Sequence, residues 1–264
     1  MKRTSNKPLI EICCGSYYDA LQAAKGGAKR IELNSALMLG GLTPSTATLK
    51  LIKQNIPDLK VITMVRPRGA GFCYGREEFQ VMEEECYELL KAGADGIAFG
   101  CLKEDHSIDI EKNKRLISII KEYHKEAVFH RAFDVVSDPV ETIEQLILLG
   151  VDRVLTSGLK AKAAEGADLI RKLQETYGNK IEILAGSGVN ATNALDLIKK
   201  TGIWQVHSSC KDWIEDVTTK GNQVSYGMLL GEKEMMYDVV NASFVASLVD
   251  AVREIASNEP RITE

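Results

Sequence analysis

The chain has 264 residues, of which 45% are hydrophobic and 27% are charged, and its formal net charge is -4. These values are ordinary for a soluble globular protein and argue against a polyanion-binding surface, so we expect no nucleic-acid partner. No window approaches the roughly 18 to 20 apolar residues of a membrane span, and the basic start of the chain lacks the apolar core of a signal peptide. We therefore expect a cytoplasmic protein without a membrane partner.

Six cysteines are scattered along the chain, with no CxxC pair and no spacing typical of a zinc site. This pattern argues against a disulfide framework and favours free thiols in a reducing compartment. We expect several of them to be small buried hydrophobic side chains, unless individual thiols reach a site.

In the first half of the chain, short apolar runs alternate with amphipathic segments. The apolar runs predict strands at 9–13, 30–34, 60–65 and 96–99. Helices are predicted from the cap Ser16 to about Ala24, from Pro44 in a first turn, at 77–91 and at 111–123. The glycine-rich loop 66–75 is long enough to reach over the mouth of a pocket.

The second half continues the same alternation. Strands are predicted at 127–130, 151–155, 181–184 and 204–207. Helices are predicted after the cap Asp138 with Pro139 in its first position, at 161–175, and after the turn that ends at Asn190, to about Lys200. An irregular excursion at 208–232 and a terminal helix at 243–256 complete the prediction. No linker divides the chain, so we expect one domain over residues 1–264.

Eight strand-then-helix units predict an α/β fold, a (β/α)8 TIM barrel with a C-terminal helix. The rival fold is a doubly wound open sheet. No GxGxxG follows the first strand, which disfavours the open sheet and indicates no nucleotide cofactor. The recurring junctions Gly93-Ala94-Asp95 and Gly150-Val151-Asp152 also favour repeated equivalent units. In a barrel of this kind, functional residues gather at the carboxyl ends of the strands.

Alternation along the strands predicts which side chains face the barrel interior. Ile10, Ile12, Ile31 and Leu33 should pack on helices, which leaves their neighbours inside. The predicted pocket is lined by Cys13, Glu32, Asn34, Arg66 and His130, with loop residues Arg68, Arg131, Asp134, Thr156, Ser157, Ser187 and Ser208. Buried charges need partners, so we expect Glu11, Glu32, Arg66 and His130 to form one hydrogen-bonded network.

The predicted pocket is suited to a small anionic ligand. Arg66 and Arg68 could hold the anion, and the turn Gly186-Ser187-Gly188 could present backbone N–H groups to a phosphate or carboxylate. Glu32, His130 and Asp134 are candidate proton carriers for general acid-base catalysis. The alternative is structural: the polar interior satisfies itself, the glycines permit a tight turn, and Arg131 ties down a loop.

Six ordered motifs resemble the CutC family over about residues 10–209. They are RIELNS (30–35), GGLTPS (40–45), MVRPRGAGFCYG (64–75), FHRAFD (129–134), RVLTSG (153–158) and AGSGVN (185–190). The resemblance implies a TIM barrel, a role in copper homeostasis, and assembly as a homodimer or homotetramer. It also implies copper binding, which has been proposed for the family through cysteines near the first two strands.

The proposed copper pair is incomplete in this chain. Cys13 matches the first cysteine, but Asn34 stands at the position of the second, and an amide oxygen is a poor ligand for Cu(I). Cys14 and Cys73 are candidate replacements between which the sequence does not choose.

Three hypotheses follow. The first is a copper homeostasis protein that binds Cu(I). The second is a cytoplasmic enzyme that uses acid-base chemistry on a small carboxylated or phosphorylated metabolite, which the retained polar side chains favour. The third is a scaffold whose role is assembly.

Overall fold

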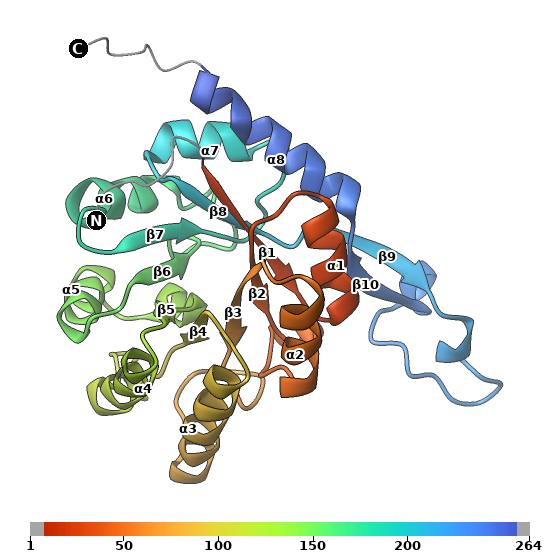
Figure 1. The fold of residues 1–264 in the computed structure, drawn as a ribbon, viewed down its shortest axis with the longest axis horizontal. Helices are drawn as coiled ribbons and strands as arrows, with labels where there is room; N and C mark the ends of the chain where they lie inside the picture. Colours follow the sequence, from red (N-terminus) through yellow and green to blue (C-terminus); the bar gives the residue numbers. More distant parts are fainter. Residues whose placement is uncertain (1–7, 258–264) are drawn as a thin grey trace.

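Eight parallel strands close into a barrel in the order of the sequence (Figure 1). The computed structural model describes residues 8–257, and the side chains of residues 8–253. The barrel strands are β1 (Leu9–Cys14), β2 (Arg30–Leu33), β3 (Lys60–Met64), β4 (Gly96–Phe99), β5 (Glu126–Phe129), β6 (Arg153–Thr156), β7 (Glu182–Ala185) and β8 (Gln205–Ser208). The predicted (β/α)8 barrel is therefore confirmed.

Helices surround the barrel, and an additional C-terminal helix lies along α7 and α1 (Figure 1). The helices are α1 (Tyr17–Lys25), α2 (Thr46–Asn55), α3 (Arg76–Lys91), α4 (Ile110–Glu122), α5 (Pro139–Leu149), α6 (Ala167–Tyr177), α7 (Ala194–Thr201) and α8 (Ala242–Ser257). Among the described residues, no helix is both long enough and apolar enough to cross a membrane.

The alternation of the strands divides the apolar residues into two groups. Ile12, Ile31 and Leu33 belong to the large core between the sheet and the helices, as predicted. A separate small cluster of Ile62, Met64, Ala98 and Val128 fills part of the barrel interior. Parallel strands that are covered on both faces need apolar side chains on both, and these two clusters meet that requirement.

Two predicted helix starts are wrong. Ser45 caps α2 by accepting from the Thr48 N–H, so Pro44 precedes the helix and is not in its first turn. The helix predicted at 161–175 begins at Ala167, and the residues 161–166 before it form bends and turns. The Ala163 N–H also donates to the Ser187 carbonyl, which holds the preceding loop in a non-helical path.

The predicted irregular excursion at 208–232 contains regular structure. Strand β9 (Lys211–Glu215) pairs in antiparallel fashion with β10 (Met236–Val240), and this hairpin stands at the side of the barrel near α1 (Figure 1). Trp213 pairs with Asp238 across the two strands, and the ammonium groups of Lys211 and Lys233 lie near its ring. The partner strand lies about twenty residues away, so the sequence between the strands does not resemble a short hairpin turn.

Candidate functional site

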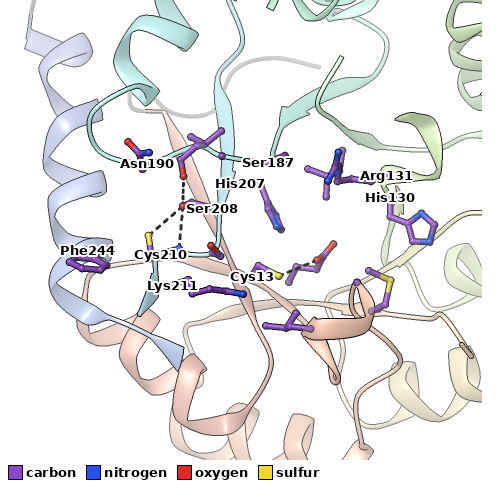
Figure 2. Close-up of a pocket in the computed structure, with 18 of the residues that line it drawn as sticks. Cys13, His130, Arg131, Ser187, Asn190, His207, Ser208, Cys210, Lys211 and Phe244 are labelled. Atoms are coloured by element: carbon purple, nitrogen blue, oxygen red, sulfur yellow. Dashed lines mark hydrogen bonds between the residues drawn. The ribbon is translucent and has the colours of Figure 1, made fainter. Parts of the chain in front are cut away.

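A cavity of about 750 Å³ opens at the carboxyl ends of the barrel strands (Figure 2). This volume lies within the range of about 300 to 1,000 Å³ that is usual for pockets binding small molecules. Of the predicted site residues, those on its wall are Cys13, Glu32, Arg66, His130, Arg131, Ser187, Gly188 and Ser208. The others, Asn34, Arg68, Asp134, Thr156, Ser157 and Gly186, are not part of the wall.

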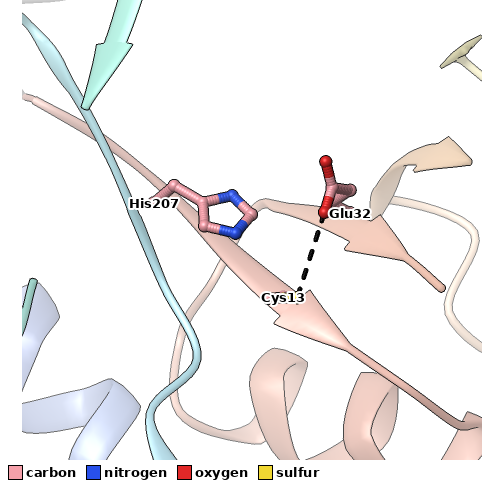
Figure 3. Close-up of side chains that lie close together, drawn as sticks. All are labelled: Cys13, Glu32 and His207. Atoms are coloured by element: carbon pink, nitrogen blue, oxygen red, sulfur yellow. Dashed lines mark hydrogen bonds between the residues drawn. The ribbon is translucent and has the colours of Figure 1, made fainter. Parts of the chain in front are cut away.

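Three side chains with metal-ligating atoms meet inside the cavity. Cys13 on β1, Glu32 on β2 and His207 on β8 each offer one ligand atom, and these atoms lie within 4.8 Å of one another (Figure 3). Neighbouring strands bring them together: Cys13 pairs with Glu32 in the register of β1 and β2, and β8 lies on the other side of β1. Among the described residues, no other such group of three or more is present.

His207 is held by a buried carboxylate. Its Nδ1 lies 2.9 Å from Oε1 of Glu11, its register partner across β1 and β8, and the other Glu11 oxygen lies 2.5 Å from Nε of Arg30. Histidines that ligate metals commonly donate their second ring nitrogen to a carboxylate in this way, which fixes the ring and increases its basicity. The contact leaves Nε2 of His207 available toward Cys13.

Burial and neighbouring charges set the protonation of the site. Burial raises the pKa of the Cys13 thiol and that of the Glu32 carboxyl. Burial also opposes ionisation of Glu11, but the charge of Arg30 and the contact with His207 outweigh it and lower the pKa of Glu11 to about 2. The pKa of His207 lies well above its usual value, because its hydrogen bonds to Cys13 and Glu11 outweigh burial. A metal ion would therefore displace protons from Cys13 and His207.

Asn34 contacts two of the three candidate metal ligands, Cys13 and Glu32. Its Nδ2 donates to Oε2 of Glu32 at 2.9 Å and lies 3.6 Å from Sγ of Cys13. The amide thus orients two of the three candidate ligands. Neither candidate replacement for the second thiol belongs to this group. Cys14 packs in the core between the barrel and the helices, and Cys73 is exposed on the 66–75 loop.

The predicted single network of Glu11, Glu32, Arg66 and His130 is wrong. Arg66 donates instead to the backbone carbonyls of Leu39, Gly41 and Ala70, at 3.1, 3.1 and 2.6 Å. His130 accepts at Nδ1 from the Ala132 N–H. Strand β5 lies across the barrel from β1 in the strand order, so His130 and Glu11 are far apart.

Arg68 is turned away from the cavity. Its guanidinium forms an ion pair with Glu78 and also donates to the carbonyls of Gly69, Gly71 and Cys73. These contacts brace the 66–75 loop against the start of α3. The structure therefore does not bring Arg66 and Arg68 together as one clamp for an anion.

Asp134 is the centre of a compact hydrogen-bonded group beyond the cavity wall. It accepts from the Thr156 hydroxyl at 2.6 Å, from the Ser157 N–H at 2.9 Å and from Nε of Arg131 at 2.7 Å. Arg131 also donates to the Ser157 hydroxyl. This group ties the short 3-10 helix η2 (Arg131–Val135) to the end of β6. Its acceptor atoms are occupied, which fits a structural role.

The turn after β7 lies beside His207. Gly186 makes close approach possible there, since a Cβ on it would lie 2.7 Å from Cδ1 of Leu155 and 3.3 Å from Cβ of His207. The Ser187 hydroxyl donates to the Ala161 carbonyl, and the Ser208 hydroxyl donates to the Val189 carbonyl. Ser187 and Ser208 reach the cavity, while their hydroxyl protons are used to hold the loops (Figure 2). Gly188 also lines the cavity.

The sequence interpretation missed His207, although it placed this residue at the end of a predicted strand. The alternation that put Glu11 and Glu32 inside the barrel also applies to 205–208, where the outward-facing Val206 separates Gln205 from His207. Applied to this strand, the same argument would have added His207 to the predicted pocket.

Comparisons with known proteins agree with the geometry of the fold. The family model described as "CutC family" matches residues 8–212. A CutC family protein from Treponema denticola is 46% identical over 244 residues, 92% of this chain and 98% of that protein. The human protein named "Copper homeostasis protein cutC homolog" is 36% identical over 245 residues, 92% of this chain and 89% of that protein. The alignments thus extend beyond the predicted match at 10–209.

Two solved structures are similar to this chain, one at 33% identity and one at 15% identity. A crystal structure of the CutC protein from Streptococcus agalactiae superposes with a TM-score of 0.73 at 33% identity, covering 76% of this chain and 98% of that one. A 3-hexulose-6-phosphate synthase from Salmonella typhimurium has a TM-score of 0.59 at 15% identity, covering 94% and 99% of the two chains, which shows the shared barrel alone. On the family match and these identities, the chain belongs to the CutC family.

Proposed function

We propose that this protein acts in copper homeostasis by binding a single copper ion through Cys13, Glu32 and His207. The observation that carries the proposal is the convergence of a thiol, a carboxylate and a carboxylate-supported imidazole within 4.8 Å. Thiolate and imidazole are both suitable ligands for copper. The name of the human relative, which is a copper homeostasis protein homolog, supports copper as the ion.

The donor set fits one metal ion but differs from the two-thiolate Cu(I) site that the family resemblance implies. Sγ of Cys13 and Oε2 of Glu32 lie 3.9 Å apart, close to the spacing of ligand atoms around one tetrahedral ion with bonds of about 2.0 to 2.3 Å. One thiolate is available rather than two, because Asn34 stands where the family resemblance implies the second cysteine, and its amide donates to Glu32. The cavity leaves room for a fourth ligand that is not part of the protein.

A competition titration tests this proposal. Purified protein is titrated with copper against a chromogenic chelator, once with Cu(I) under reducing conditions and once with Cu(II). We expect one equivalent to bind, and the binding to be lost in Cys13→Ala and His207→Ala. Cys73→Ala is the matched control, because Cys73 is exposed and lies outside the cavity wall. Equal affinity in the wild-type and Cys13→Ala proteins would refute the proposal.

The second candidate, an enzyme using acid-base chemistry on a small carboxylated or phosphorylated metabolite, has weaker support. The cavity is larger than a metal ion needs, which favours an organic ligand. However, burial and the charge of Arg66 lower the pKa of His130 to about 3, so this ring is a poor proton acceptor near neutral pH. Asp134 has its oxygen atoms occupied by Thr156, Ser157 and Arg131. Only Glu32 remains in place as a candidate proton carrier.

We further propose that the protein works in the cytoplasm as a homodimer or homotetramer. All six cysteines are free thiols, which is compatible with a reducing compartment. The family resemblance supports assembly. Cell fractionation and light scattering after gel filtration would test the two statements, and a periplasmic or monomeric protein would contradict them.

A further inference from the structure

The cavity wall beyond β3, next to the strand that carries Glu32, has a buried positive charge without a counter-ion. Arg66 is 5% exposed, and its hydrogen bonds go to backbone carbonyls. The buried Tyr74 hydroxyl interacts with Arg66. Among the side chains described over residues 8–253, no carboxylate forms an ion pair with Arg66, and its Nε has no acceptor in hydrogen-bond geometry. A buried charge of this kind is costly unless a partner of opposite sign is supplied.

A second unpaired donor lies near Arg66. His130 is 2% exposed and accepts at Nδ1 from the Ala132 N–H at 3.2 Å, so the proton of the neutral ring is on Nε2. That Nε2 also has no acceptor among the described residues. The low pKa of His130, caused by burial and by the charge of Arg66, keeps the ring neutral and Nε2 protonated near neutral pH.

Phe72 lies against both donors. Its ring centroid is 5.1 Å from Cζ of Arg66 and 5.0 Å from the ring centroid of His130, and all three residues are on the cavity wall. Phe72 is half-buried on the 66–75 loop, so it shields the two N–H groups. A ligand head group would reach them after this ring turns aside. Much of the remaining wall is apolar, including Leu37, Met64 and Leu155.

We propose that this part of the cavity binds an amphiphilic organic carboxylate, with its head group at Arg66 and His130 and its apolar body along the cavity wall. Two acceptor oxygens would satisfy the two unpaired N–H groups, and their negative charge would balance that of Arg66. The apolar wall provides the contact surface for the body of the ligand. This site shares the cavity with the candidate metal ligands but uses none of them, and it does not depend on metal binding.

Calorimetric titration with a matched pair of probes tests the inference. Octanoate and 1-octanol have the same apolar chain and differ in the carboxylate, so we expect octanoate to bind at least about tenfold more tightly. His130→Asn keeps an acceptor for the Ala132 N–H but removes the distal donor, and it should weaken octanoate binding about tenfold while leaving octanol unchanged. His130→Phe, which keeps an aromatic ring against Phe72, should have the same effect.

Two variants serve as controls. His124→Asn changes an exposed histidine at a positive φ angle that asparagine tolerates, so octanoate binding should be unchanged. Cys13→Ala should lose the metal and keep octanoate binding, which separates this inference from the proposed function. Absence of octanoate binding, equal affinity for octanol, or full octanoate affinity in both His130 variants would overturn the inference.

Discussion

Nδ1 of His207 lies 2.9 Å from Oε1 of Glu11, and this contact orients the one candidate metal ligand contributed by β8. Arg30 lies against the other Glu11 oxygen, and its charge helps to hold the pKa of this carboxyl at about 2 against the effect of burial. Glu11 therefore stays ionised under ordinary conditions. The position of Nε2 of His207 thus depends on a charge pair whose members are not themselves candidate metal ligands.

Glu11→Gln should weaken copper binding about 10- to 100-fold, because loss of a carboxylate behind a ligating histidine typically has an effect of that size. The measurement is the same chelator competition, combined with a denaturant titration because Arg30 also loses its counter-ion. Glu126→Gln is the control, since Glu126 pairs with Arg153 and has no contact with His207. Unchanged copper affinity in Glu11→Gln would contradict the role of this carboxylate.

Asn34→Cys should increase the affinity for Cu(I) at least about tenfold, because a second thiolate favours this soft ion. The expected position is good: Nδ2 of Asn34 already lies 3.6 Å from Sγ of Cys13. Cu(I) competition titration measures the change. Asn34→Ala is the matched control, because it removes the hydrogen bond to Glu32 without adding a thiol. If Asn34→Cys and Asn34→Ala bind Cu(I) equally, the second position does not take part in the site.

The eight strand-then-helix units were enough to predict the barrel, and alternation along single strands was enough to predict the inward side chains of β1 and β2. The run from Arg30 to Asn34 shows why: Ile31 and Leu33 must pack on helices, so Glu32 is turned inward toward Cys13. This argument needs only the period of a strand and the burial of both faces. The argument predicted that Cys13 and Glu32 face the barrel interior, and the same argument applied to β8 would have predicted this for His207.

The hydrogen-bond partners of residues whose contacts lie in loops could not be predicted from the sequence. Arg66 was expected to contact a carboxylate, but the three carbonyls that it contacts belong to the 37–42 and 66–75 loops, whose paths no periodicity describes. Arg68 differs from Arg66 by only two positions, yet it turns outward because Glu78 on α3 lies within reach. Partner choice at these positions follows from loop geometry, so the predicted network was wrong.

Asp134→Asn should reduce the free energy of unfolding by roughly 2 to 4 kcal/mol and leave copper affinity unchanged. The amide would place donor hydrogens against the donors of Thr156 and Ser157, leaving buried groups unsatisfied. Urea denaturation measures the change in stability. The control is Asp138→Asn, because asparagine caps a helix as well as aspartate does. A stable Asp134→Asn variant that has lost ligand binding would instead support a direct functional role for Asp134.

The pKa of His130 predicts a stability that falls as the pH is lowered. Burial, and then the charge of Arg66, lowers its folded-state pKa from 6.5 to about 3, so the unfolded chain takes up the proton first. The neutral ring stabilises the fold fully above pH 6.5, and this contribution falls by about 1.4 kcal/mol per pH unit between the two pKa values.

His130→Asn removes this titration, so its free energy of unfolding should depend less on pH than that of the wild-type protein. The difference is measured by urea denaturation between pH 6.5 and 5, because the contribution of Glu11 is lost only below its unfolded-state pKa of 4.5. His124→Asn should keep the wild-type slope, since His124 is exposed. If the wild-type and His130→Asn proteins lose stability in parallel over this range, His130 is not held neutral by the fold.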